Sequence, residues 1–233
     1  MPDKHLSTQF DSEMTSVSSQ VMDMGGLVES QILGAIKALS NRSLEAAEAV
    51  ALAEARVNAM EIEIDRDLSS IIARRQPTAR DLRLLIAISK TTANLERVGD
   101  EAAKIARMAR SIIDAGAPRS LPTVELRYAG ELASGLLNKA LDAFARLDTN
   151  AALSILKEDD KIDREFDSFV RILITYMMED PRTISASLDL LFLAKAIERI
   201  GDHAKNIAEF IIYVVKGEDV RHSSLAEVEQ AIQ

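Results

Sequence analysis

The feature of this sequence that most constrains its fold is an internal repeat. The pentapeptide ERVGD at residues 96–100 recurs as ERIGD at residues 198–202, which is an offset of 102 positions. An acidic segment further upstream, EIEID at residues 61–65, matches DREFD at residues 163–167 at the same offset. Because the matches occur in the same order at one offset, they indicate a duplicated unit.

Breaks between helices are few and fall at matching places in the two halves. Glycine and proline are scarce, at 9 and 5 residues, so the intervening segments favour long helices. Pro118 and Pro122 flank a break near the midpoint, and Pro77 and Pro181 mark one turn in each half. Asp180 is suited to cap the helix that begins at Pro181. These breaks predict six helices, at residues 7–40, 43–75, 78–114, 122–147, 150–179 and 181–216.

The predicted fold is therefore all-α: two tandem three-helix bundles related by internal duplication. We expect the first bundle at residues 1–114, a linker at residues 115–122 and the second bundle at residues 123–216. A loose polar tail is expected at residues 217–233.

Composition excludes several classes of function. The chain has no cysteine, which rules out disulfides, thiolate metal sites and cysteine nucleophiles. The net charge of −9 argues against nucleic acid as a partner, because binding to phosphates requires a basic surface. No apolar run is long enough to span a membrane, and the polar N-terminus does not read as a secretory signal. We expect a cytoplasmic protein without a catalytic constellation.

Acidic pairs four residues apart recur beside the apolar seam of two helices in each half. One residue corresponds to about 100° around a helix, so each pair lies at the border between core and solvent. On neighbouring antiparallel helices such pairs can converge in the shared groove, and their mutual repulsion would be relieved by a cation. All-oxygen ligands suit hard ions such as Mg, Mn, Ca or Fe(III). The candidate metal ligands are Glu61, Asp65, Glu96, Asp100, Asp163, Asp167, Glu198 and Asp202.

A simpler interpretation competes with the metal site. Acids four apart are common on exposed helix faces, and basic residues lie within or just after the repeated motif. Arg97, Arg199, Lys104 and Lys205 could neutralise the acids through internal salt bridges. Both interpretations remain open from the sequence.

Several motifs in order resemble those of the PhoU family. They are the two pentapeptides at residues 96–100 and 198–202, together with MGGLVE at 24–29, RQPTARDLR at 75–83 and YMMED at 176–180. The resemblance implies two symmetric three-helix bundles in a cytoplasmic, often homodimeric regulator. Such a regulator contacts the ATPase subunit of the phosphate ABC transporter and the phosphate-sensing histidine kinase, and it represses the phosphate-starvation response. The resemblance also implies metal ions, Fe, Mn or Mg, held by the eight acids named above.

One pair of equivalent candidate ligands differs in side-chain length: Asp163 stands where the first half has Glu61, which is longer by one methylene group. The shorter side chain could alter the choice of metal. No segment suggests a loop that cradles phosphate, so the sequence does not support direct phosphate sensing.

The sequence leaves two alternative functions to compare with a regulator. A di-iron carboxylate enzyme needs a Glu-x-x-His pair on each of two helices, and none of His5, His203 and His222 follows a glutamate by three residues. A purely structural dimerisation module with exposed acids is the second alternative.

Overall fold

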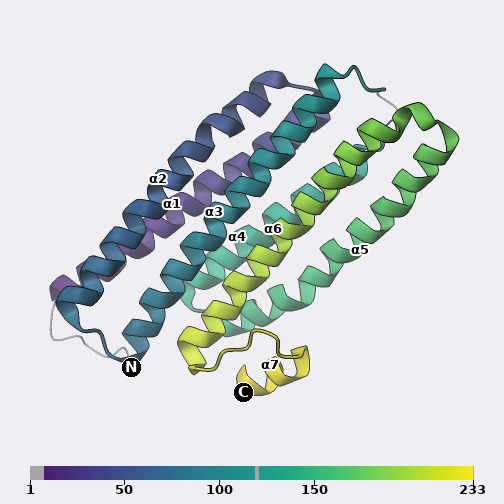
Figure 1. The fold of residues 1–233 in the computed structure, drawn as a ribbon. Helices are drawn as coiled ribbons and strands as arrows, with labels where there is room; N and C mark the ends of the chain where they lie inside the picture. The colour runs from purple at the N-terminus through teal and green to yellow at the C-terminus, as the bar shows by residue number, and fades with distance from the viewer. Residues whose placement is uncertain (1–7, 119–120, 233) are drawn as a thin grey trace.

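The computed structural model describes residues 8–118 and 121–232, and this part of the chain is helical without a strand. Six long helices and a short seventh follow one another along the chain (Figure 1). They are α1 (Thr8–Asn41), α2 (Leu44–Arg75), α3 (Ala79–Asp114), α4 (Val124–Arg146), α5 (Thr149–Glu179), α6 (Ile184–Lys216) and α7 (Leu225–Ile232). The predicted all-α fold is confirmed, although residues 1–7 and Arg119-Ser120 of the predicted first bundle and linker lie outside the described residues.

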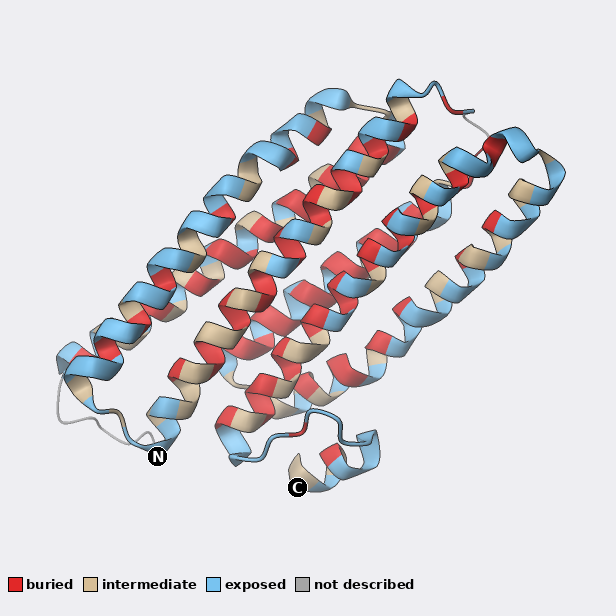
Figure 2. Cartoon of the chain, in the orientation of Figure 1, coloured by how far each residue is buried: buried red, intermediate tan, exposed pale blue. Residues whose placement is uncertain are grey.

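Two three-helix units lie side by side along one axis (Figure 1). Helices α1 to α3 pack on one another, as do α4 to α6, and the most extensive contact between the units is made by α3 and α6. Helix α1 also packs against α4. The buried residues of both units form one continuous hydrophobic core, which appears as red stripes on the facing sides of the helices in Figure 2. The units therefore share a core, and the exact boundaries predicted for them remain predictions.

Side chains at the helix starts explain where several helices begin. Ser43 accepts a hydrogen bond from the amide of Ala46, and Asp148 accepts one from the amide of Ala151, each at the N-terminus of a helix. Asp180 caps the next start as predicted, but the residues that follow, Pro181–Thr183, form a short 3-10 turn. Helix α6 consequently begins three residues later than its predicted start at residue 181.

The predicted apolar seams are largely buried. On α6 the whole seam is buried, since α6 packs against both α5 and α3; its residues are Leu190, Leu193, Ile197, Ile200, Ala204, Ile207 and Ile211. On α5 the seam residues Phe166 and Met177 are only half-buried, because α5 lies at the outer edge of the second unit. One side of α5 therefore keeps apolar atoms at the surface.

The prediction of a loose C-terminal tail is wrong. Helix α7 folds back against α5, where Val228 is buried and Glu229 pairs with Lys157 at 2.5 Å. Ser224 and Glu227 form a capping box, in which the Ser224 amide donates to the Glu227 carboxylate at 2.7 Å. This Ser-x-x-Glu pattern is present in the sequence and indicates a helix start, but the polar composition of the segment favoured a loop.

Candidate functional site

The four acids of the first unit lie along the groove between α2 and α3. Gly99 allows the two helices to approach closely, because a Cβ at that position would lie 3.3 Å from Cγ1 of Val57. One end of the groove is held by Ser89 on α3, whose hydroxyl donates to Oδ1 of Asp65 at 3.0 Å. This register brings Glu61 on α2 to the level of Glu96 on α3.

Burial and charge repulsion raise the pKa values of two carboxyl groups in this groove. Partial burial raises the pKa of Glu61, and the carboxylates of Asp65 and Asp100 raise it further. Partial burial likewise raises the pKa of Glu96, with contributions from Asp100 and Glu61. The Arg97 guanidinium opposes both shifts. The structure thus brings the four acids of the first unit into one electrostatic cluster.

Three of the four acids predicted in the second unit gather between α5 and α6. The pKa of Asp163 is raised by partial burial and by the charges of Asp159 and Glu198. The pKa of Asp202 rises to about 6, chiefly because its carboxyl group is partly desolvated, and secondarily because Glu198, Asp159 and Asp163 are near. Asp167 lies one turn further along α5, away from Asp202, and is exposed.

Asp159 takes the place in this cluster that sequence reasoning gave to Asp167. It is 1% exposed, and its Oδ2 lies 3.1 Å from Nζ of Lys205. Its carboxylate lies against Gly201, where a Cβ would be 3.2 Å from Oδ1 of Asp159. The repeat did not reveal this residue because the equivalent position in the first unit is Val57. The sequence signal that could have identified Asp159 is its position one helical turn before Asp163.

The basic residues that could have neutralised the candidate acids pair mainly with other carboxylates. Arg199 and Lys104 both contact Glu101, each at 3.3 Å, and Lys205 contacts Asp159. Arg97 forms no ion pair within the described part of the chain. Among the eight candidate acids, Glu198 alone has an ion pair within residues 8–118 and 121–232, with Lys195 at 2.6 Å. Internal salt bridges therefore account for little of the acidic pattern.

A buried polar network joins the two units where α3 meets α6. Asn94 on α3 accepts hydrogen bonds from Nδ1 of His203 at 2.9 Å and from Nδ2 of Asn206 at 3.1 Å. Because the Asn94 amide nitrogen donates to the Lys90 carbonyl, its oxygen faces His203, which fixes the Nδ1–H tautomer. Burial, together with Arg199 and Arg97, lowers the pKa of His203 to about 4. His203 is thus a neutral structural histidine between the units.

One carboxylate oxygen of the second groove is left without a partner among the described residues. Oε2 of Glu198 is buried and has no hydrogen-bond partner in the described part of the chain, whereas Oε1 accepts from Lys195, so Oε2 is an unsatisfied acceptor. Asp163 and Asp202 are exposed and can rotate toward it. As the side chains stand, no three acidic or histidine side chains among the described residues are placed to enclose a metal ion, so binding would require such rotations.

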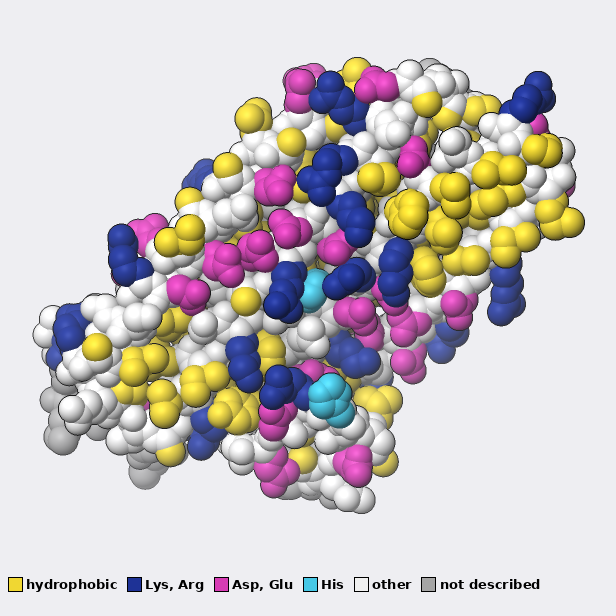
Figure 3. All heavy atoms as spheres, viewed as in Figure 1, with side chains coloured by type: hydrophobic (Ala, Val, Ile, Leu, Met, Phe, Trp, Pro, Cys, Tyr) yellow, Lys and Arg dark blue, Asp and Glu magenta, His cyan; other side chains and the backbone are white. Residues whose placement is uncertain are grey.

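At the molecular surface, the acidic side chains of the two grooves form separate groups. Figure 3 shows acidic side chains in two groups, separated by a band of Lys and Arg side chains with a histidine between them. Apolar side chains gather at the far end of the second unit in the same view. Within the described ranges, no helix combines the length and the apolar character needed to cross a bilayer.

Fold and site together define a class: an internally duplicated helical bundle with a carboxylate groove in each unit. The PhoU domain model matches both units, at residues 21–109 and 126–211. A phosphate-specific transport system accessory protein PhoU homolog from a Burkholderia species is 52% identical, over 99% of this chain and 98% of its own length. The corresponding PhoU protein of Escherichia coli K12 is 47% identical, over 98% of this chain and 94% of its own length.

Solved structures agree with these sequence matches. The crystal structure of PhoU from Pseudomonas aeruginosa superposes with a TM-score of 0.86 and is 45% identical in sequence, covering 90% of this chain and all of that one. The chain belongs to the PhoU family.

Proposed function

We propose that this protein is a regulator of phosphate uptake and a repressor of the phosphate-starvation response. The observation that carries the proposal is the match over nearly the full length of the chain to proteins named as accessory components of the phosphate-specific transport system. Both units match the PhoU domain model, which supports a role for the whole chain in that system.

The mode of action we propose is that of a non-catalytic adaptor in the cytoplasm. It would contact the ATPase subunit of the phosphate ABC transporter and the phosphate-sensing histidine kinase, as a homodimer. The relatives are named as accessory proteins, and His203 is engaged in the network between α3 and α6, which does not favour the di-iron enzyme. A long, rigid bundle with chemically distinct surface regions suits the simultaneous contact of two partners.

We further propose that the acidic grooves bind hard cations, and that the second groove binds more tightly. In the second groove Asp163, Glu198 and Asp202 would hold the ion, with Asp159 behind them. The ion would supply positive charge that cancels the repulsion raising the pKa values of Asp163 and Asp202. Asp159 and Lys205 would keep α5 and α6 at a fixed separation around the site.

A paired experiment tests the adaptor proposal. The protein is co-purified with the transporter ATPase and with the kinase from cells grown in high and in low phosphate, and transcription of phosphate-starvation genes is followed in a deletion strain. We expect binding to at least one partner in high phosphate, and derepression in the deletion strain that the intact gene reverses. Absence of both partners in both conditions, or unchanged transcription in the deletion strain, would refute the proposal.

A further inference from the structure

The far end of the α5–α6 hairpin carries an unusually apolar surface. Large apolar side chains are exposed there on both helices and form the yellow group at the upper right of Figure 3. Met178 is 79% exposed and Phe192 is 54% exposed. We call this surface the apolar face; it consists of Ile174, Met178, Ile184, Leu188 and Phe192. A contiguous exposed patch of this kind in a folded protein marks a contact surface.

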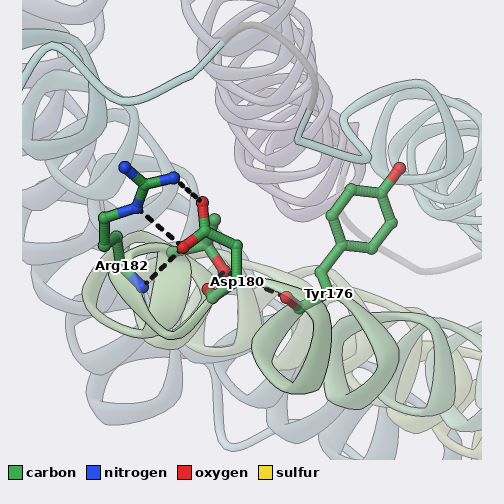
Figure 4. Close-up of polar contacts among 4 residues, drawn as sticks. Tyr176, Asp180 and Arg182 are labelled. Atoms are coloured by element: carbon green, nitrogen blue, oxygen red, sulfur yellow. Dashed lines mark hydrogen bonds and ion pairs between the residues drawn. The ribbon is translucent and has the colours of Figure 1, made fainter.

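The turn that joins the two helices holds the apolar face in a fixed shape. The Asp180 amide donates to the Tyr176 carbonyl at 3.1 Å, and the Arg182 amide donates to the Asp180 carboxylate at 3.1 Å. The Arg182 guanidinium makes two further hydrogen bonds to the same carboxylate (Figure 4). The apolar residues of α5 and α6 are therefore held in fixed relative positions before any partner binds, which reduces the entropic cost of docking.

The first unit shares only part of this apolar character: Ile72 and Leu82, at the positions of Ile174 and Ile184, are 40% and 37% exposed. At an offset of 102, Gln76 stands where the second unit has Met178, and Lys90 stands where it has Phe192. The Lys90 ammonium covers the Phe210 ring at 5.4 Å from its centroid. The two most exposed positions of the apolar face are therefore polar in the first unit.

The apolar face continues into the acidic groove. On α5, Asp167 precedes Ile174 by seven residues, which places both on the same side of the helix two turns apart. Between the two regions, the Lys195 ammonium lies 5.3 Å from the centroid of the Phe166 ring. Beyond it stand Asp163 and Asp202, which lack ion pairs within the described residues. A ligand lying along α5–α6 would meet apolar side chains at one end and uncompensated carboxylates at the other.

We propose that the apolar face docks an amphipathic helix of a partner protein, with apolar residues at helical spacing and Lys or Arg residues beyond one end of that stripe. The apolar stripe would lie between α5 and α6, and the basic end would contact Asp163, Asp167 and Asp202. The proposal rests on the adaptor function in that it assigns the docking surface of that adaptor. A cation held by the same acids competes with the basic end, so metal binding weakens docking.

Peptide binding to the full-length protein tests the proposal directly. The probe is a synthetic helical peptide of about 18 residues with a leucine stripe and three lysines at one end, and its binding is followed by fluorescence anisotropy in a chelator. We expect saturable binding that the double variant Met178→Ser/Phe192→Ser weakens about tenfold or more. The matched control, Leu33→Ser/Leu52→Ser, removes equally exposed leucines from α1 and α2 and leaves affinity within about twofold.

Two further arms examine the charged end. Replacing the three lysines of the peptide by glutamates weakens binding about tenfold, and adding Mn(II) weakens binding of the lysine peptide but not of a peptide with neutral glutamines. Absence of binding by the lysine peptide, equal binding by the Met178→Ser/Phe192→Ser variant, or indifference to the charge of the peptide would each overturn the proposal. Thermal unfolding and circular dichroism confirm that the variants are folded.

Other occupants have distinct signatures. A dimer that Met178→Ser/Phe192→Ser dissociates in analytical ultracentrifugation would identify a second copy as the occupant, and vesicle binding lost in the same variant would identify a lipid surface; either overturns the helix proposal. The adaptor function is judged separately by co-purification of the unsubstituted protein with the ATPase and the kinase. If that fails while the peptide binds as described, the adaptor function falls and the docking surface stands.

Discussion

In the α2–α3 groove Val57 packs beside Gly99, whereas at the equivalent point of the α5–α6 groove Asp159 packs beside Gly201. The partner of Asp159 is Lys205, and the residue equivalent to Lys205 in the first unit is alanine. The first unit therefore has apolar residues at the place where the second unit has an ion pair with one buried partner, Asp159, and one partly exposed partner, Lys205. The close approach of the helices is what the fold requires, and the charge at this place is an addition of the second unit that borders its carboxylate cluster.

The largest expected effect comes from breaking that ion pair. Lys205→Met leaves the Asp159 carboxylate buried without a counter-charge, and we expect a loss of about 2–3 kcal/mol in the free energy of unfolding, less than for a fully buried pair because Lys205 is partly exposed. Urea denaturation at pH 7.5 measures it.

A double variant sharpens the same comparison. Asp159→Val combined with Lys205→Ala installs the residues of the first unit, and stability should return to within about 1 kcal/mol of the unsubstituted protein. If the double variant is as unstable as Lys205→Met, the two grooves do not share the packing described here.

A second difference between the units lies at the contact of α3 and α6, where His203 is the counterpart of Glu101 at the same offset. Since burial lowers the pKa of His203 from its ordinary 6.5 to about 4, the folded state holds the ring neutral. The stability that this contributes is fully present above pH 6.5 and is lost as the pH falls toward 4, by about 2 kcal/mol between pH 8 and pH 5.

The variant His203→Gln tests this linkage. Glutamine keeps a donor for Asn94 but does not titrate, so its loss of stability between pH 8 and pH 5 should be about 2 kcal/mol smaller than that of the unsubstituted protein. The difference between the two proteins isolates His203 from the oppositely sloped contributions of Asp202 and Glu209, whose pKa values are raised. Parallel pH dependences would show that folding does not shift the pKa of His203.

Cation affinity distinguishes the two grooves. Asp163→Asn with Asp202→Asn should weaken Mn(II) binding about tenfold, because two of the anionic ligands become neutral. Glu61→Gln with Asp100→Asn in the first unit should have a smaller effect on the tightest site. Isothermal titration calorimetry of both variants decides the order, and a larger loss from the first-unit variant would reverse the assignment.

The smallest effect is expected at the C-terminal helix, which has no counterpart in the first unit. Ser224→Ala removes the capping box and should lower the local stability of α7 by about 1 kcal/mol, leaving global unfolding unchanged. Hydrogen exchange of the α7 amides reports the change. Equal protection in both proteins would mean that packing of Val228 alone holds the helix.

Much of the fold was predictable because its signals are local and repeated. Proline, glycine and capping residues fixed the helix boundaries to within a few residues, and the duplication placed the same seam in both units. The start of α6 differs because Pro181 favours a tight turn after Asp180, and a 3-10 turn satisfies the cap as well as an α-helix does. The tail was mistaken for a loop because polar composition outweighed the Ser224 and Glu227 pattern.

The site was less predictable, because it depends on axial register between helices. A sequence offset shows which acids are equivalent, but it does not show which turn of α5 faces Asp202. Asp159 rather than Asp167 meets α6 at that level, since Gly201 sets the crossing point. The sequence repeat does not reveal the network of Asn94 and His203 either. Asn94 corresponds to Ala196 in the second unit, and His203 corresponds to Glu101 in the first, so neither residue is repeated.

We propose the carboxylate groove of the second unit as the stronger cation site of this PhoU-family protein. Anomalous diffraction from crystals soaked in Mn(II) tests it most directly. We predict the strongest anomalous peak between α5 and α6, within coordination distance of Glu198 and of at least one of Asp163 and Asp202. A strongest peak between α2 and α3, or no peak in either groove at saturating Mn(II), would contradict the account.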